Sequence, residues 1–281
     1  MKPFLALLRK HVHDTRGTLI LSCAAFFALG WLFVFVTSLN ETEILKVLAS
    51  DEQGGRFRWI RNMGLGPEEQ PPPSVSIMVA FWSHPFIIAI IAMWAIARGS
   101  VAVAAEVERG TMDLILSRPV SRIAYLFSHV LTAVVGLYLL ALTLALGAWA
   151  ATHYNVLRVP PGFGILVLPA FNLATLGLPI YGYTLLASSV DQVRWRPLMI
   201  GSVLTLAGFI AWVISVIPVL QKYTWRAWLE KVTIFKLYNP VDAVAAAEHL
   251  GFDVAVLAGL GAGFIVLAFL GFVRRDLPAN G

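Results

Sequence analysis

The chain has 281 residues, of which 58% are hydrophobic and only 13% are charged, and its mean hydropathy is +0.77. Soluble domains carry about 25% charged residues, so the composition excludes an ordinary soluble protein and indicates a membrane protein. The pI near 9.5 would suit a nucleic-acid-binding protein, but the basic residues are scattered between apolar blocks and form no continuous patch. Because Cys23 is the single cysteine, an intrachain disulfide and a paired-cysteine metal site are excluded.

Six apolar segments are long enough to cross a bilayer, which takes about 20 residues for roughly 30 Å of hydrocarbon. In chain order they are 17–39, 75–105, 124–152, 162–189, 197–220 and 254–273. The first is longer than the apolar core of a signal peptide and has no small-residue cleavage site, so we expect a retained helix. The sequence therefore predicts an all-α, polytopic membrane protein with six transmembrane helices. Residues 1–281 are expected to form a single transmembrane domain.

The distribution of lysine and arginine predicts the orientation, because these residues accumulate in cytoplasmic loops. If both termini are cytoplasmic, 12 of the 21 basic residues but only six of the 16 acidic residues lie on the inner side. We therefore expect a multi-pass protein of the cell's inner (cytoplasmic) membrane. Both termini and residues 106–122 would then face the cytoplasm.

Two segments flank the first span. Residues 1–16 carry phenylalanine and leucine among lysine and arginine, which predicts a short amphipathic helix on the inner membrane surface. The first outer loop, residues 40–74, starts with a helix-like stretch at 42–50 and ends in a proline-rich spacer.

The loop between the fifth and sixth spans is predicted to be a helical outer insertion. Tryptophans recur at helical spacing among lysine and arginine in residues 225–235, which is typical of a helix in the outer headgroup layer. Asn239 and Pro240 are a helix start, with an N-cap followed by proline at the first helical position. Gly251 is expected to end that second short helix.

Residues 106–122 form the one compact polar element on the inner side, Glu-Val-Glu-Arg-Gly-Thr-Met-Asp-Leu-Ile-Leu-Ser-Arg-Pro-Val-Ser-Arg. Its two glutamates, Glu106 and Glu108, are expected to end the second span where it reaches water. Gly110 permits backbone angles that other residues resist, so the chain can turn there.

A short helix is predicted after this turn. Thr111 is a candidate N-cap and Asp113 suits the positive helix end, while Pro119 stops the helix and Ser121 caps the third span. The result is a rigid helix of about two turns at 112–118. From these residues alone, an ordinary helical inner loop is an equal alternative.

This pattern, placed between the second and third of six spans, resembles the coupling segment of ABC-2 type transporter permeases. The resemblance implies that the segment is a coupling helix, which seats in a cleft of a separate ABC ATP-binding subunit. It further implies two ATP-binding subunits and two permease halves, the second identical or similar to this chain. The Asn239-Pro-Val-Asp242 stretch is similar to the subgroup that includes the permease of the nitrous-oxide reductase maturation transporter.

The resemblance also implies which residues contact the ATPase. Arg109 stands where many relatives carry an acid or a glycine, so the pairing is expected to differ in detail. The residues carried over are Glu106, Glu108, Arg109, Gly110, Thr111, Met112, Asp113, Leu116, Ser117, Arg118 and Pro119.

No motif for ATP chemistry is present in the chain itself. It lacks Gly-x-x-x-x-Gly-Lys-[Ser/Thr], the loop that cradles phosphates, and contains no Gly-Lys pair. We therefore expect ATP and Mg²⁺ on the partner subunit, and no catalytic residue, cofactor or metal here. His11, His13 and Asp14 resemble a metal cluster only by composition.

Polar residues within the spans are candidates for a translocation path: His84, Arg98 and Asn172. Each has a structural alternative. Arg98 can extend to the inner headgroups, His84 with Pro85 can shape a kinked helix, and Asn172 can serve packing. His129 is expected to be an interior hydrogen-bonding residue.

The leading prediction is the permease subunit of an ATP-driven exporter. The alternative is an assembly or signalling subunit that uses the same ATPase without passing a solute. A secondary transporter is disfavoured, because such proteins generally carry buried acids for ion coupling and no Asp or Glu falls inside a predicted span. The substrate stays open.

Overall fold

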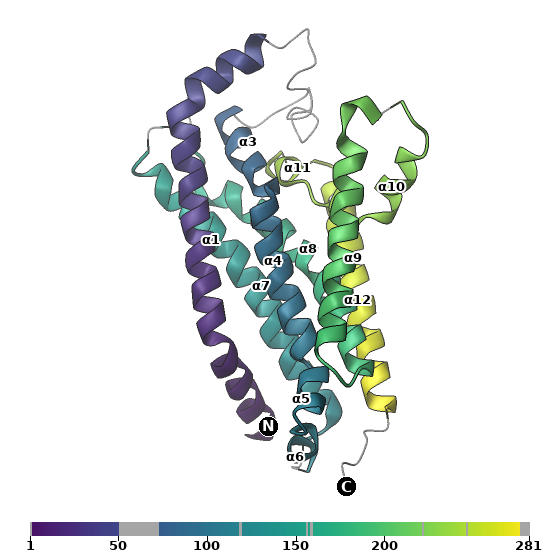
Figure 1. Cartoon of the computed structure of the whole chain (residues 1–281). Coiled ribbons are helices and arrows are strands. Elements are labelled where there is room, and N and C mark those ends of the chain that lie inside the picture. The colour runs from purple at the N-terminus through teal and green to yellow at the C-terminus, as the bar shows by residue number, and fades with distance from the viewer. Residues whose placement is uncertain are drawn as a thin grey trace.

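The computed structural model describes residues 2–50, 73–117, 120–155, 157, 160–220, 222–245 and 247–275. All regular elements in these ranges are helices, and the long ones run side by side as a bundle (Figure 1). Five are long and apolar enough to cross a membrane: α1 (Lys2–Ser50), α7 (Arg122–Thr152), α8 (Phe163–Val190), α9 (Trp195–Val216) and α12 (Leu250–Arg274).

The second predicted span, 75–105, is not one helix. It is divided into α3 (Pro73–Ala80), the 3₁₀ turn η1 (Phe81–Ser83), α4 (Pro85–Val101) and α5 (Ala104–Glu108). Proline disfavours a helical conformation of the residue before it, and His84 is accordingly extended, at φ −63° and ψ 138°. Its Nδ1 accepts a hydrogen bond from the Phe86 N–H at 3.3 Å and so caps α4. The prediction that His84 and Pro85 shape the helix is confirmed. α4 itself has 17 residues.

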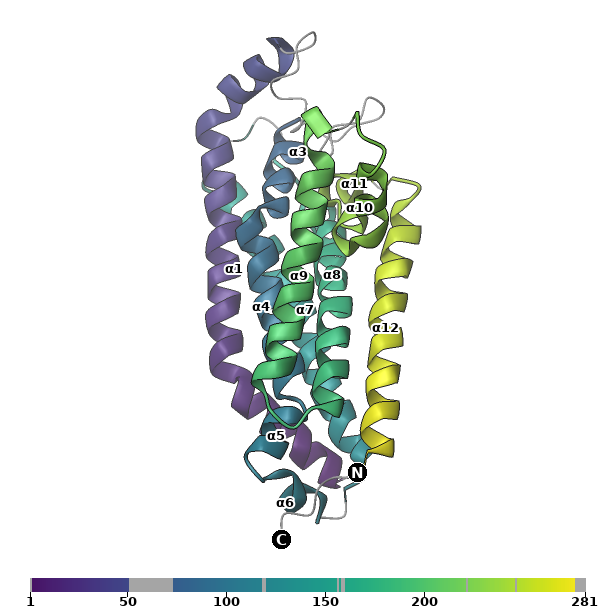
Figure 2. The same cartoon turned by 45° about the vertical axis from the view of Figure 1, so that its right-hand side comes forward.

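The predicted helices at 1–16 and 42–50 are not separate from the first span, because α1 is continuous from Lys2 to Ser50. No proline interrupts the sequence between Pro3 and Pro67, and Gly17 alone does not end the helix. Figure 2 shows the first turns of α1 running obliquely to the rest of the helix.

The segment between α9 and α12, predicted as an outer insertion, is helical as predicted and consists of η2 (Pro218–Leu220), α10 (Arg226–Val232), η3 (Ile234–Leu237) and α11 (Pro240–Val244). The Asn239 cap is confirmed, since its Oδ1 accepts from the N–H groups of Val241 and Asp242 at 3.1 and 3.4 Å. α10 packs against α9, whereas α11 packs against α8 and α3.

We had predicted that Gly251 ends α11, and this prediction is wrong. That helix already ends at Val244, and Gly251 lies in the first turn of α12. α12, which corresponds to the predicted span 254–273, therefore starts earlier than residue 254 and includes Asp253 in its first turn.

Small residues bring α1 and α7 into close contact. A Cβ atom at Gly147 of α7 would collide with the backbone oxygen of Phe27, and one at Gly30 of α1 with the backbone oxygen of Leu144. Backbone atoms cannot move away as a side chain can, so both positions require glycine. Close approach at small residues is a general means of helix association in membranes.

Gly147→Ala is therefore expected to destabilise the protein by about 1–3 kcal/mol, the usual cost of overpacking. The matched control is Gly259→Ala in α12, where an added Cβ would meet nothing within 4 Å and where alanine stabilises a helix by roughly 0.5–1 kcal/mol. Thermal unfolding in detergent, followed by tryptophan fluorescence, distinguishes the two. Equal melting temperatures would contradict the close α1–α7 contact.

Candidate functional site

The polar element predicted at 106–122 is built from α5, a turn and the short helix α6 (Met112–Leu116). This α5–α6 segment (residues 104–117) projects at the end of the bundle where α1 begins and α12 ends (Figure 1). Gly110 has φ 68°, so the predicted turn is confirmed. α6 has five residues, fewer than the predicted 112–118; Arg118 and Pro119 lie outside the described residues.

Thr111 does not cap α6 with its side chain, so that prediction is wrong. Its backbone is helical (φ −87°, ψ −13°), and its hydroxyl donates to the Glu106 carboxylate and to the Glu106 carbonyl, the latter at 3.2 Å. The Thr111 N–H also donates to the Glu106 carbonyl, at 3.0 Å. Glu106 and Thr111 thus close the turn around Gly110. Ser121, in contrast, caps α7 as predicted, accepting from the Ala124 N–H at 3.1 Å.

α6 has a buried side and an exposed side. Met112 is 2% exposed, so it is a packing residue and not the surface contact that the resemblance implied. The exposed α6 face consists of Arg109, Gly110, Asp113, Leu114 and Ser117.

Leu114 is 68% exposed and was missed by the sequence analysis. A usable signal was present, since Leu114, Ile115 and Leu116 are consecutive and residues on a helix point about 100° apart. Therefore not all three side chains can face the bundle, and at least one of them had to be exposed.

The break between α4 and α5 is held by side chains from two other helices. The Ser188 hydroxyl of α8 accepts from the N–H groups of Val103 and Ala104 at 3.2 and 3.0 Å, and donates to the Ser100 carbonyl at 3.1 Å. The Tyr125 hydroxyl of α7 donates to the Ala102 carbonyl at 2.8 Å. The helix thus breaks earlier than Glu106, where we had predicted its end.

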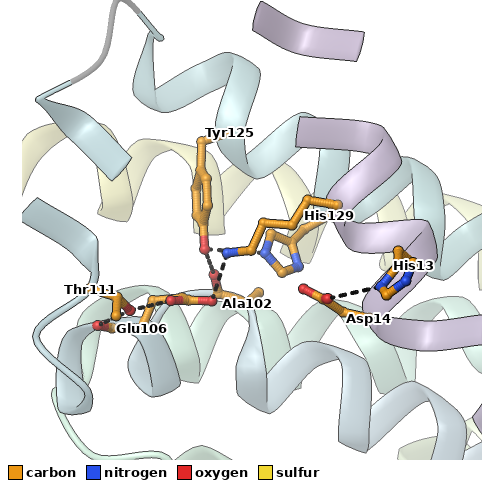
Figure 3. Close-up of polar contacts among 8 residues, drawn as sticks. His13, Asp14, Ala102, Glu106, Thr111, Tyr125 and His129 are labelled. Atoms are coloured by element: carbon orange, nitrogen blue, oxygen red, sulfur yellow. Dashed lines mark hydrogen bonds and ion pairs between the residues drawn. The ribbon is translucent and has the colours of Figure 1, made fainter. Parts of the chain in front are cut away.

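Side chains of α7 and α1 lie next to this break, and Figure 3 shows Tyr125 and His129 of α7 beside Ala102 and Glu106. His129 Nε2 lies 3.1 Å from the Tyr125 hydroxyl oxygen. Because the Tyr125 hydroxyl already donates its proton to the Ala102 carbonyl, it accepts from His129, which is the donor. The prediction of an interior hydrogen-bonding role for His129 is confirmed. The ring of His11 lies on that of His129, with centroids 3.7 Å apart, and the neighbouring Lys10 pairs with Glu106 at 3.6 Å.

Other charged residues at this end satisfy the termini of the long helices. A Glu108 carboxylate oxygen accepts from the Arg194 N–H at the start of α9, at 2.9 Å. Arg122 of α7 donates to the last carbonyls of α12, including those of Phe272 and Val273 at 3.3 Å. Arg275 donates to the Ser189 carbonyl at the end of α8, at 3.2 Å. It also donates to the carbonyl of Asp191, just beyond this helix, at 2.7 Å. Its burial lowers the pKa of Arg275, while Asp191 acts in the opposite direction.

The three candidates for a translocation path do not form one site. His84 and Arg98 stand at opposite ends of α4, roughly 20 Å apart at 1.5 Å per residue. Arg98 lies 5.4 Å from the Trp94 ring centroid. Asn172 of α8 is 1% exposed, and neither its amide oxygen nor its nitrogen has a hydrogen-bond partner in the described part of the chain.

The described residues contain no group of three or more His, Cys, Asp or Glu side chains placed to hold a metal ion. The ring of His11, from the sequence cluster at 11–14, lies against that of His129 at an interplanar angle of 44°, while the neighbouring His13 and Asp14 approach each other at 3.8 Å.

Comparison with known proteins identifies the family. A family model described as ABC-2 family transporter protein matches residues 16–277, a range that includes α4, the α5–α6 segment and α7–α9 in full. No curated protein matches the chain. The family consists of transmembrane subunits that associate with ABC ATP-binding subunits. The chain belongs to the ABC-2 transporter family and is a membrane permease subunit of an ABC transporter.

Proposed function

We propose that this permease is the transmembrane half of an ATP-driven exporter, moved by a separate ATP-binding subunit that docks on the exposed α6 face. One observation carries the proposal. The α5–α6 segment exposes Leu114 and Asp113 at its tip, while its other side is bonded to four long helices. An apolar side chain at the centre of an exposed charged tip is suited to a protein partner.

Each of the four attachments is specific. Glu106 pairs with Lys10 of α1, and Glu108 holds the amide at the start of α9. The preceding break is bonded to Tyr125 of α7 and Ser188 of α8. A displacement of α6 therefore reaches four helices without passing through a flexible linker.

Between α4 and α6 the helix is interrupted at two places, the α4–α5 break and the turn at Gly110. In the proposed cycle, the ATP-binding subunit displaces α6, and α5 transmits this movement to α4, α7, α8 and α9.

The proposed assembly contains two permease halves, identical or similar, and two ATP-binding subunits that hold ATP and Mg²⁺. Each half has six spans, α3 and α4 together forming the second. The start of α1, the end of α12 and the α5–α6 segment share one end of the bundle (Figure 1). The surplus of lysine and arginine at that end supports a cytoplasmic location for it, in the inner membrane. Membership of the subgroup that includes the permease of the nitrous-oxide reductase maturation transporter stays a prediction.

Site-directed crosslinking tests the docking face. Because Cys23 is the only cysteine, Cys23→Ser provides a cysteine-free background. A photo-crosslinker on Leu114→Cys is expected to attach to a subunit that carries the Gly-x-x-x-x-Gly-Lys-[Ser/Thr] loop. The control, Val232→Cys, is similarly exposed (72% against 68%) but lies in the outer insertion. Labelling from Val232 alone, or from neither position, would refute docking on α6.

Gly110→Val is expected to uncouple the complex without unfolding the spans. A β-branched residue at φ 68° is strained by about 1–2 kcal/mol, so the turn reopens and α6 is displaced. Gly110→Asn is the matched control, since asparagine tolerates this conformation. Pull-down of the ATP-binding subunit and ATP hydrolysis in nanodiscs are measured for both. Equal behaviour of the two variants would show that the turn geometry has no role.

Glu108→Ala removes the acceptor of the Arg194 N–H at the start of α9. Loss of a helix cap costs about 1 kcal/mol, so amide exchange in the first turn of α9 is expected to rise about fivefold. The change that ATP causes in amide exchange at this first turn of α9 should disappear, while ATP hydrolysis continues. Hydrogen–deuterium exchange with and without ATP measures this, with Glu230→Ala in α10 as the control. A normal ATP response in Glu108→Ala would exclude transmission through this bond.

A further inference from the structure

Two arginines near the α5–α6 end of the bundle have guanidinium groups that form no ion pair with a carboxylate among the described residues. Arg98 lies in the last turn of α4, and Arg194 directly precedes α9. Both are half-buried, and the Nε atom of each is buried without a hydrogen-bond partner in the described part of the chain. A buried N–H donor without a partner costs free energy, and the remaining guanidinium nitrogens of these half-buried side chains are free to bind a ligand.

The two side chains belong to helices that pack against each other. A Cβ atom added at Gly201, in the second turn of α9, would lie 3.3 Å from Cγ2 of Ile96 in α4. Arg98 and Arg194 are within electrostatic range of each other, where their charges repel. Tyr181 of α8 is also within range of Arg98, but it is fully buried, so its hydroxyl does not reach a ligand outside the bundle.

Nearby carboxylates do not neutralise the pair. Asp14 of α1 is within electrostatic range of Arg98, but its carboxylate makes its close contact with His13, at 3.8 Å. The carboxylate of Glu108 accepts from the backbone N–H of Arg194. His11 and His129 also act electrostatically with Arg98, and neither ring supplies negative charge.

The surroundings of Arg194 are those of a lipid headgroup layer. The next residue, Trp195, is 61% exposed, and the guanidinium of Arg196 lies 5.9 Å from its ring centroid. Tryptophan with arginine is typical of the membrane–water interface. Further along α9, Met199 and Val203 are 49% and 55% exposed, so an apolar surface leads away from the arginine into the bilayer.

We propose that Arg98 and Arg194 bind the phosphate group of an anionic phospholipid from the adjacent leaflet. Guanidinium groups match phosphate oxygens with paired hydrogen bonds. The lipid phosphate removes the repulsion between the two arginines, and its acyl chains lie along the exposed side of α9. The site belongs to the permease alone, so its test is independent of the ATP-binding subunit and of the proposed function.

Native mass spectrometry of the full-length permease in detergent tests this proposal. The chain is titrated with phosphatidylglycerol, with phosphatidylcholine and, separately, with inorganic phosphate. The wild type is expected to bind the first phosphatidylglycerol about tenfold more tightly than phosphatidylcholine, the effect of one strong charge-assisted contact. Arg98→Gln with Arg194→Gln should abolish the preference.

Arg196→Gln is the matched control. Arg196 is two residues from Arg194, but its guanidinium is exposed and pairs with Asp191 at 3.7 Å, so the lipid preference should remain. Size-exclusion profiles show whether each variant is folded; if the double variant is not, Arg194→Gln alone replaces it. Unchanged phosphatidylglycerol binding in the arginine variants overturns the proposal. Displacement of the lipid by millimolar inorganic phosphate also overturns it, because the site would then bind free anions.

Discussion

Every backbone amide and carbonyl inside a membrane needs a hydrogen-bond partner, because the hydrocarbon supplies none. The break between α4 and α5 is possible only because Ser188 and Tyr125 provide such partners. Ser188 uses its full capacity there, accepting two N–H groups and donating its proton to the Ser100 carbonyl. The position of α5, and with it the position of α6, therefore depends on two side chains from other helices.

The same requirement explains where much of the scarce charge is used. The last carbonyls of a helix have no partner within it, and a cation near them is favoured by the helix dipole. Arg122 satisfies the end of α12, and Arg275 satisfies the end of α8. At the start of α9, the anion Glu108 satisfies an amide. The basic surplus in the sequence is thus partly structural, and it joins helix ends that are far apart along the chain.

The sequence predicted those features that depend on neighbouring residues. The turn at Gly110 and the caps by Ser121 and Asn239 follow from residues within three positions, and all three are confirmed. The long helices α7, α8, α9 and α12 were found because hydropathy is a local average. Pro85 likewise revealed that the helix changes shape at His84.

Features that depend on distant partners were not predicted. The helix break at Ala102 depends on Ser188, 85 positions after Val103, and no local residue indicates it. Thr111 had a better partner in Glu106 than in the amides of α6, which required the folded turn to be seen. Met112 was carried over as a contact residue although it is buried, and the exposed Leu114 was missed, because the direction of α6 is fixed by what holds α5.

Arg194 takes part in both proposals. Its amide is held by Glu108 of α5, and its guanidinium is within electrostatic range of Arg98 in α4. A movement of α5 that pulls on the Arg194 amide through its 2.9 Å bond to Glu108 alters the first turn of α9, and so alters the separation of the two arginines. Because coupling between binding sites is reciprocal, a lipid phosphate bound between the arginines would in turn bias the position of α5. Occupation of the lipid site and docking on α6 are therefore expected to influence each other through one residue.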